Sequence, residues 1–435
     1  IGDDGCGSLS SRAAGALARA QILVGGERQL AFFPDFAGPR IPLRGDLQAA
    51  LAQVADLARE QTVCVLSSGD PLFFGIGARI VSAVGSEHVE FIPAPSSVQW
   101  AFARTGISWE DALVLSVHGR SAEGFVARVR SAAKVAVLTD ADNNPAALAA
   151  RLIEFGEFGF EAWVCERLAG PAERVRRFTL EELANTRDLD PLNVLLLSRT
   201  DPDWRAPCSV PGLPEEAFAK RIPKQGLITK REVRVLSLSA LQLRPDSVLW
   251  DVGAGSGSVA IESALLAPKG RVYAIEVDPE CVAMCRENAR AHGADNVRVI
   301  AGLAPEACHG LERPDCVFVG GSKGSLTSII ALALDVLRPG GRLVVNAITL
   351  ENIGEAYAAL RERQYEPEVT LVQIARGVPL ARYLRYESLN PIHIFAVRKG
   401  DNVSRAGASE PGTREAEQSP APAPLPNASE AGGPT

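Results

Sequence analysis

Residues 248–262, VLWDVGAGSGSVAIE, constrain the fold of this chain more than any other stretch. The apolar, partly β-branched first half is typical of a buried parallel strand. Gly253, Gly255 and Gly257 follow at once, and the apolar residues after them begin a helical pattern. A strand, a glycine turn and a helix bring bare backbone N–H groups and a helix N-terminus to a ligand. We therefore expect a ligand-binding turn between this strand and this helix.

The spacing of the three glycines discriminates between classes of ligand. A dinucleotide fingerprint would place its third glycine where Ser258 stands, whereas this chain has G-x-G-x-G. Asp251 lies two residues before the first glycine, and an acid there suits a positively charged ligand better than a pyrophosphate. S-adenosylmethionine fits this pattern. A NAD-dependent oxidoreductase is disfavoured, also because no catalytic His or Tyr-Lys pair is evident. Three glycines alone are often only a turn, so the interpretation needs support from the surrounding sequence.

That support comes from a regular alternation of strand and helix signals. Further strand-like runs cover residues 271–277, 297–301, 315–320 and 342–347, with helical patterns such as 279–293 between them. Glu276 lies near the end of the second strand, where a carboxylate can accept hydrogen bonds from both ribose hydroxyls of a nucleotide. The alternative is a strand-end carboxylate that faces water. The alternation predicts an α/β domain with a doubly wound sheet.

Composition divides the chain of 435 residues into two domains, a linker and a tail. The predicted bounds are residues 1–198 for the first domain, 199–214 for a proline-rich linker and 215–400 for the second domain. Residues 401–435 contain no aromatic residue and are rich in Pro, Ala, Ser, Gly and Glu. We expect a disordered tail there.

Charge and cysteine usage narrow the class of protein. A net charge of −7 gives no reason to expect nucleic acid as a partner. The sequence contains no apolar run of about 18 residues, so we expect no membrane span. Ile1 and Gly2 resemble the end of a strand, and no signal peptide is visible after them. The eight cysteines lie mostly in apolar runs, which indicates a reducing, cytoplasmic compartment. Cys281 and Cys285 lie four apart, but no histidine or second cysteine pair completes a zinc site, so we expect no metal.

The first domain repeats the motif of a strand followed by a loop of small residues. Three strand-like runs, at residues 63–67, 91–92 and 135–138, lead into loops at 68–77, 93–97 and 139–140. Small residues at successive strand ends make a backbone-lined crevice, which is where open α/β sheets bind ligands. The residues alone indicate only a nucleotide-like ligand.

Three motifs of the first domain resemble the tetrapyrrole methylase family, the methyltransferases of corrin and sirohaem synthesis. They are IGDDG at residues 1–5, GDPLFFG at 69–75 and PSS at 95–97. The resemblance implies a two-lobed class III methyltransferase domain in which S-adenosylmethionine lies folded between the lobes. The cofactor contacts that it implies are Ser68, Gly69, Asp70, Phe73, Ser96, Ser97 and Thr139.

The second domain resembles the decarboxylating precorrin methylases. Besides the glycine loop, the motifs lie at residues 226–234, 304–307, 319–322 and 338–342. The resemblance implies a Rossmann-like class I methyltransferase domain that binds a second S-adenosylmethionine. The cofactor contacts that it implies are Thr229, Gly253, Ala254, Gly255, Ser256, Gly257, Glu276 and Ala304. Relatives often have an acid where Leu303 stands, so contact with the adenine amino group could fall to backbone near Ala304.

The order of the two domains is similar to that of bifunctional precorrin methyltransferases of cobalamin synthesis. The resemblance implies methylation of two meso carbons of a reduced tetrapyrrole, with loss of CO₂ from an acetate side chain. Alignment of the reactants matters more for such a transfer than a strong base, and no catalytic acid or base is identified. Arginines are the natural anchors for the many carboxylates of the substrate. The candidate substrate contacts are Ser322, Lys323, Asn346, Arg376 and Arg385, with solvated surface cations as the alternative for the charged ones.

Two other interpretations stay open at this point. One domain could be inactive, which would leave a single-step tetrapyrrole methyltransferase. The chain could also be a non-catalytic scaffold that binds S-adenosylmethionine. Both parent folds usually self-associate, so we expect a homo-oligomer.

Overall fold

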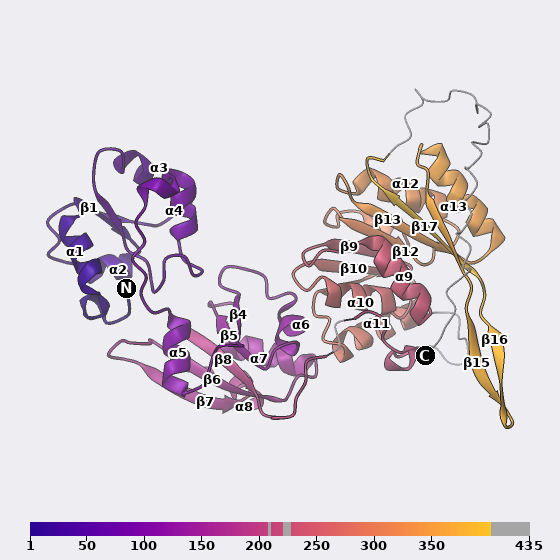
Figure 1. Cartoon of the computed structure of the whole chain (residues 1–435), viewed down its shortest axis with the longest axis horizontal. Coiled ribbons are helices and arrows are strands. Elements are labelled where there is room, and N and C mark those ends of the chain that lie inside the picture. Colours follow the sequence, from indigo (N-terminus) through magenta and orange to yellow (C-terminus); the bar gives the residue numbers. More distant parts are fainter. Residues whose placement is uncertain (208–209, 221–227, 402–435) are drawn as a thin grey trace, which may run out of the picture.

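A computed structural model describes residues 1–207, 210–220 and 228–401. The tail expected at 401–435 lies outside the described residues except for Asp401, as do Gly226 and Leu227 of one motif and positions 208 and 209 of the expected linker. Three α/β units follow one another along the chain (Figure 1). We call them the first lobe, the second lobe and, after the fold that its motifs resemble, the methyltransferase domain. The two lobes together make up the first domain.

The first lobe is built on a small parallel sheet with strand order β2-β1-β3. The central strand β1 is fully buried, and helices pack around the sheet. The elements are α1 (Ser11–Arg19), β1 (Ile22–Gly25), α2 (Glu27–Ala31), β2 (Arg40–Pro42), α3 (Leu47–Leu57), β3 (Val63–Val65) and α4 (Gly77–Val84), with short 3-10 helices at Gly5–Ser8 and Ser86–His88.

The second lobe has a five-stranded sheet with strand order β4-β5-β8-β6-β7, in which only β4 and β5 are parallel. Strand β4 pairs on one side only and so leaves a free edge. The elements are α5 (Ser97–Thr105), β4 (Leu113–Ser116), α6 (Phe125–Arg130), β5 (Lys134–Leu138), α7 (Pro145–Glu154), β6 (Phe160–Glu166), β7 (Arg174–Thr179), α8 (Leu180–Ala184) and β8 (Asn193–Arg199).

The methyltransferase domain is a doubly wound α/β domain around a seven-stranded sheet with the order β11-β10-β9-β12-β13-β17-β14. Its first elements are a 3-10 turn at Glu215–Ala217, α9 (Arg231–Leu241), β9 (Val248–Val252), α10 (Ser258–Leu266), β10 (Arg271–Glu276), α11 (Pro279–Ala291) and β11 (Val297–Ala301). The elements that follow are a 3-10 turn at Glu306–Cys308, β12 (Cys316–Val319), α12 (Leu326–Val336), β13 (Arg342–Ala347), α13 (Leu350–Glu362), β14 (Glu368–Val372), β15 (Ala375–Leu380), β16 (Tyr383–Ser388) and β17 (Ile392–Arg398).

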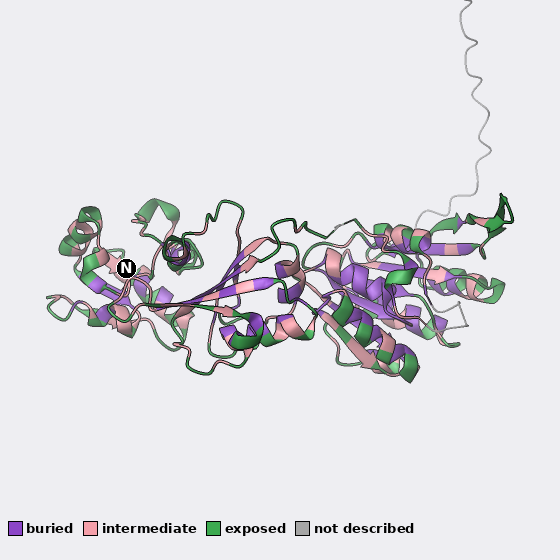
Figure 2. Ribbon diagram, turned by 90° about the horizontal axis from the view of Figure 1, so that it is seen from below, coloured by how far each residue is buried: buried purple, intermediate pink, exposed green. Residues whose placement is uncertain are grey.

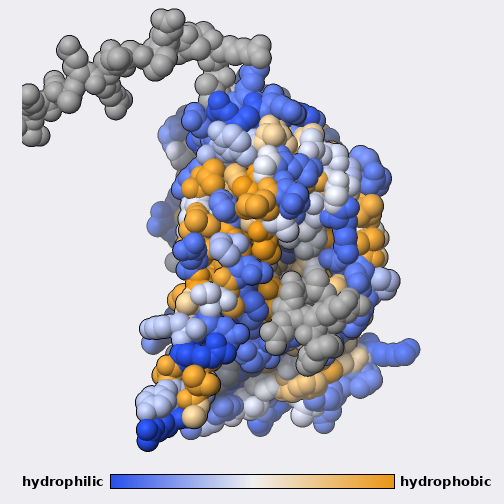
Figure 3. Space-filling view, turned by 90° about the vertical axis from the view of Figure 1, so that its right-hand side faces the viewer, coloured by the Kyte–Doolittle hydropathy of each residue, from blue (hydrophilic) through white to orange (hydrophobic). Residues whose placement is uncertain are grey.

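The five strands predicted from the sequence are the parallel strands β9 to β13, and that prediction is confirmed. Strands β17 and β14 extend the sheet antiparallel, while β15 and β16 form a separate two-stranded ribbon that projects from the domain (Figure 1). Figure 3 looks onto this end of the molecule, where hydrophobic residues gather on the surface among hydrophilic ones.

Residues on β9 alternate between the two hydrophobic layers of the domain. Trp250 and Val252 pack in the layer covered by α12 and α13, and Leu249 packs in the layer that includes α9 and α10. This alternation is the pleat of a strand whose two faces are both buried (Figure 2).

The two domains meet where α6 and α7 approach the methyltransferase domain. Asp295 is buried and accepts hydrogen bonds from the backbone of Val126 and Ala127 and from Arg151 Nε at 2.9 Å. Gly124 has φ +72°, and a Cβ there would lie 2.0 Å from the carbonyl oxygen of Pro268. Only glycine permits this close approach of the two backbones. Across the described ranges, no helix combines the length and apolar composition needed to cross a bilayer.

Candidate functional site

A cavity of about 560 Å³ opens at the carboxyl ends of β9, β10, β12 and β13. Strand ends of parallel sheets meet at one edge, so the loops that follow them line a common crevice. The residues predicted as cofactor or substrate contacts that line it are Thr229, Gly253, Ala254, Gly255, Glu276, Ala304, Ser322, Lys323 and Asn346. Ser256 and Gly257, also predicted as contacts, do not line it.

The glycine loop after β9 has the backbone geometry that its sequence indicates. Gly253, Gly255 and Gly257 have φ of +72°, +56° and +83°, all in the left-handed region. A Cβ at Gly253 would lie 2.4 Å from the carbonyl oxygen of Gly321, so this turn packs backbone against backbone on the loop after β12. The absence of a side chain therefore keeps the floor of the cavity open and lined by peptide groups.

Glu276 closes one side of the cavity. Its Oε2 accepts a hydrogen bond from Gly255 N at 2.8 Å, and its Oε1 accepts from Val277 N at 2.8 Å and Asp278 N at 2.9 Å. The side chain is buried, at 7% exposure. Backbone donors therefore hold the carboxylate in one position between the glycine loop and the end of β10, and Oε2, which accepts a single hydrogen bond, keeps a lone pair for a ligand hydroxyl.

Asp251 does not lie where the sequence argument placed it. We expected its charge to serve a cationic ligand, but its side chain is buried and does not line the cavity. Burial raises its pKa to about 7, and the charge of Glu276 adds to the rise. The physical reason is the strand pleat, which turns position 251 away from the crevice and toward α10.

Sequence analysis did not single out the ion pair that anchors the rim of the cavity. Arg234 Nε lies 2.8 Å from Glu262 Oε1, with both side chains almost fully buried. Arg234 also donates to the carbonyl oxygens of Thr229 at 2.7 Å and Leu213 at 2.5 Å. Arg234 lay inside one quoted motif and Glu262 ended another, yet no spacing rule pairs positions on different helices. The pair fixes the segment that presents Thr229 to the cavity.

Asn346 and Lys323, which the sequence predicts as substrate contacts, both line the cavity. Asn346, on β13, exchanges a hydrogen bond with Ser237 Oγ on α9 at 2.9 Å. Lys323 lies in the loop after β12 with φ +50°, is exposed, and makes no ion pair within the part of the chain that the structure describes. The geometry leaves its ammonium group available to an anion at the mouth of the cavity.

Arg376 and Arg385 are not brought to the cavity. Arg376 Nη2 lies 2.7 Å from Glu215 Oε1 and 2.6 Å from Glu232 Oε2. Burial would raise the pKa of Glu215, but hydrogen bonds from Arg376 and Lys230 outweigh it and lower that pKa. Arg385 is exposed on the ribbon, 3.5 Å from Glu387. Two carboxylates thus already neutralise Arg376, which leaves little charge for a substrate carboxylate.

The contacts predicted for the first domain lie on both lobes. Asp70 Oδ1 accepts from Leu72 N at 2.8 Å and holds the loop after β3 in a tight turn, while Phe73 is partly exposed on that loop. Ser96 caps α5, and a Cβ on Gly69 would lie 3.0 Å from its Cα, so the two segments touch.

The remaining contacts predicted for this domain are Ser68, Ser97 and Thr139. Ser68 Oγ accepts from Gln29 at 2.8 Å, and Ser97 is the first residue of α5. Thr139 follows β5 in the second lobe, where its Oγ1 donates to Asn193 Oδ1 at 2.8 Å. Among the described cavities, none gathers all seven predicted residues.

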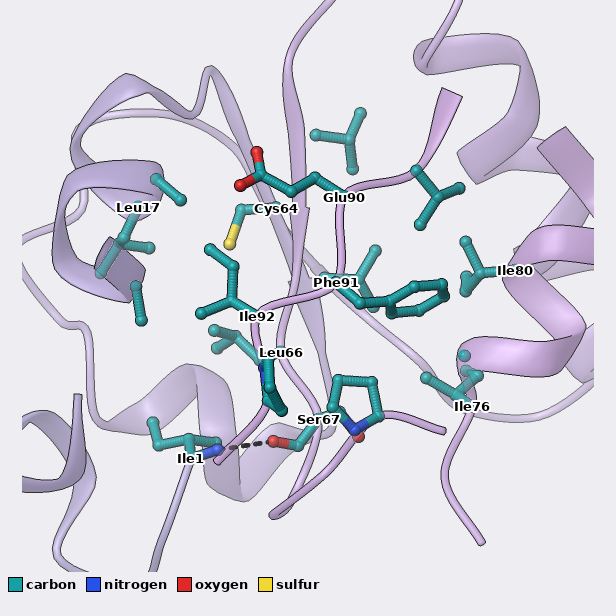
Figure 4. A pocket seen from close by; sticks show the side chains of 18 of the residues that line it. Ile1, Leu17, Cys64, Leu66, Ser67, Ile76, Ile80, Glu90, Phe91 and Ile92 are labelled. Carbon is teal, nitrogen blue, oxygen red and sulfur yellow. Dashed lines mark hydrogen bonds between the residues drawn. The ribbon is translucent and has the colours of Figure 1, made fainter. Parts of the chain in front are cut away.

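A second cavity of about 560 Å³ lies inside the first lobe (Figure 4). Its lining is largely apolar and includes Leu17, Ile80 and Phe91, and β3 borders it with the edge that does not pair with β1. The amino group of Ile1 donates to the carbonyl oxygen of Ser67 at 2.7 Å at one end. Of the predicted cofactor contacts, only Gly69 lines it. Its apolar walls do not suit a nucleotide.

Comparison with known proteins identifies both halves of the chain. Residues 1–184 match the family described as Tetrapyrrole (Corrin/Porphyrin) Methylases, and residues 220–399 match the precorrin methyltransferase domain. A protein of Sinorhizobium sp named precorrin-6Y C(5,15)-methyltransferase [decarboxylating] is 34% identical over 407 residues, which are 92% of this chain and 95% of that protein. A protein of Mycobacterium tuberculosis with the same name is 35% identical over 407 residues, 92% of this chain and 98% of that protein.

Another relative matches less than half of this chain. A protein of Pyrobaculum calidifontis, named probable cobalt-precorrin-6B C(15)-methyltransferase (decarboxylating), is 41% identical over 193 residues. These cover 43% of this chain and 96% of that protein.

Proposed function

The chain belongs to the family of decarboxylating precorrin-6Y C(5,15)-methyltransferases, and from that premise we propose its reaction in detail. It methylates precorrin-6B at the meso carbons C5 and C15, removes CO₂ from a ring acetate and yields precorrin-8X in cobalamin biosynthesis. The observation that carries this proposal is the presence of both family domains in one chain, with an open cavity at the strand ends of the second.

We infer one S-adenosylmethionine site in each domain. In the methyltransferase domain, the open turn at Gly253 and the fixed carboxylate of Glu276 fit a nucleoside, because peptide groups and an acceptor for hydroxyls face the same cavity. Leu303 and Ala304 line the side where an adenine would lie. In the first domain, the site is formed by the loop at Asp70, the N-terminus of α5 and, from the second lobe, Thr139.

The cofactor supplies a methyl group on a positively charged sulfur. The chain's own residues then have to orient the reacting carbon, exclude water and hold the substrate carboxylates. Lys323 offers a cation and Asn346 an amide at the mouth of the second-domain cavity. Ser237 fixes the side chain of Asn346, so the amide is held before substrate arrives.

We assign decarboxylation and the C15 methylation to the methyltransferase domain, and the C5 methylation to the first domain. The name of the Pyrobaculum calidifontis protein, a C(15)-methyltransferase that this chain matches over 193 residues, supports the assignment. A homo-oligomer and a cytoplasmic location stay predictions.

The proposal is tested by product analysis with the full chain, S-adenosylmethionine and enzymatically prepared precorrin-6B. We expect a product that has gained two methyl groups and lost one CO₂, by mass spectrometry. The Gly255→Arg variant should stop the decarboxylating methylation and the Asp70→Arg variant the other one.

A single methylation in the unaltered protein would favour the interpretation with one inactive domain. No methyl transfer, with cofactor bound, would favour the non-catalytic scaffold and overturn the proposal.

A further inference from the structure

A third cavity, of about 600 Å³, lies at the junction of the two domains. The loop after β3 contributes Phe74, the free edge of β4 contributes Leu113 and Leu115, and the amino ends of β9 and β10 contribute residues of the methyltransferase domain. In Figure 1 this junction lies between the first lobe and the methyltransferase domain, beside β4 and α6. We call this third cavity the junction cleft.

The junction cleft carries more positive charge than its own carboxylates neutralise. Arg120, Arg128 and Lys269 line it, and none of them has a carboxylate within 4.0 Å in the described part of the chain. Arg128 is half-buried and donates only its Nε, to the carbonyl oxygen of Gly124 at 3.1 Å. Burial lowers its pKa, the nearby Asp295 opposes this, and Arg120 lowers it further.

Two of the three acids that line the junction cleft are held in short ion pairs. Glu123 lies 2.5 Å from both Arg271 and Arg298, and Glu312 lies 2.6 Å from Arg271. The third acid, Asp246, is exposed and lies 3.9 Å from Arg244. None of the three forms an ion pair with Arg120 or Arg128. A half-buried guanidinium without an anionic partner is unfavourable unless a ligand supplies one.

Apolar residues also line the junction cleft. Leu113 lies on the edge strand, and Phe74 is 46% exposed on the loop that carries Asp70. A small inorganic anion would use only the cations. A flat apolar ring system with carboxylates at its periphery would use the cations and Phe74, because guanidinium groups bind carboxylates in paired hydrogen bonds and an exposed aromatic side chain can cover the ring.

We propose that the junction cleft binds the polycarboxylate tetrapyrrole for the methylation carried out by the first domain. Arg120 and Arg128 bind peripheral carboxylates, Phe74 packs on the ring, and Lys269 completes the site from the other domain. This inference rests on the proposed function for the class of substrate. Because Phe74 shares a loop with Asp70, the bound ring lies beside the first-domain cofactor loop. The methyltransferase domain thereby contributes to the substrate site of its neighbour.

The test measures binding of uroporphyrin, a stable porphyrin with eight carboxylates, to the full chain by fluorescence titration without methyl donor. We expect the double variant Arg120→Gln/Arg128→Gln to weaken binding about tenfold or more, because each lost charged hydrogen bond contributes strongly to affinity. Arg120→Lys/Arg128→Lys should recover part of it. Lys269→Gln, in the other domain, should weaken binding too and raise the KM of the first-domain methylation more than it lowers kcat.

The matched control is Arg59→Gln/Arg79→Gln, which removes two exposed arginines outside the junction cleft and should leave uroporphyrin binding unchanged. Titration of S-adenosylmethionine into each variant checks that both domains are folded. Unchanged uroporphyrin affinity in a folded Arg120→Gln/Arg128→Gln protein would overturn the inference. Displacement of uroporphyrin by equimolar inorganic phosphate would also overturn it, since the site would then be one for small anions.

These results separate the inference from the proposed function. If the arginine variants bind uroporphyrin normally while both methylations proceed, only the junction cleft assignment fails. If the full chain transfers no methyl group, the proposed function fails whatever the porphyrin titration gives.

Discussion

Replacing Asp251 by Asn should change how the stability of the protein depends on pH. The carboxyl group is fully buried on β9, and burial raises its pKa from 3.8 to about 7. In the folded protein it therefore keeps its proton up to neutral pH, whereas in the unfolded chain it ionises near pH 4. Asn has nearly the same shape and carries no titratable proton, so it imitates the protonated form.

The sign and the size follow from proton linkage. Between about pH 4 and pH 7 the folded state holds a proton that the unfolded state releases, so the free energy of unfolding falls as pH rises. Each unit of pKa difference corresponds to about 1.4 kcal/mol, and about three units give about 4 kcal/mol over the whole range. Between pH 5 and pH 8 the expected loss is about 3 kcal/mol, and above pH 7 the curve levels off.

Urea unfolding at pH 5 and pH 8, followed by circular dichroism, measures this effect. The stability of Asp251→Asn relative to the unaltered protein should increase by about 3 kcal/mol from pH 5 to pH 8. Any constant cost of burying the amide cancels in this comparison. Asp246→Asn removes an exposed aspartate just before β9 and is the control. A difference that is the same at both pH values would refute the reasoning, because Asp251 would then be ionised in the fold.

Further predictions concern the methyltransferase domain. Glu276→Gln should weaken binding of S-adenosylmethionine to this domain about tenfold by calorimetry, because a charged acceptor is replaced by a neutral one; unchanged affinity would exclude a ribose contact. Gly253→Ala should lower both cofactor affinity and the thermal midpoint, since its Cβ would lie 2.4 Å from the backbone of Gly321; a fully active variant would contradict the packing. Arg234→Met should cost about 3–5 kcal/mol in the urea unfolding free energy, because it leaves Glu262 buried and unpaired; a loss below about 1 kcal/mol would contradict that.

The regular part of the fold could be predicted because its signals are local. Strands β9 to β13 are apolar runs separated by glycine turns, and buried parallel strands produce that pattern directly. The position of Glu276 at the edge of the cavity followed from the same rule, since adjacent parallel strands end together. Strands β15 and β16 were not predicted, because residues 375–388 carry no run of apolar residues that distinguishes a projecting ribbon from a loop.

The parts of the site that could not be predicted depend on contacts between distant segments. Arg376 was expected to face the substrate, yet Glu215, far away in the sequence, binds it instead. Asp251 was given a role from its spacing to the glycines, but the face of the strand on which it lies is set by tertiary packing. Arg120 and Lys269 come together only where the two domains meet, and no pattern within either domain indicates that junction.

The central claim is that one chain holds two methyl-donor sites, and isothermal calorimetry with S-adenosylmethionine tests it most directly. The unaltered protein should bind two molecules per chain, whereas Asp70→Arg and Gly255→Arg should each bind one. A stoichiometry of one would identify a silent domain and contradict the bifunctional account. No binding to a folded protein would contradict the assignment of both sites.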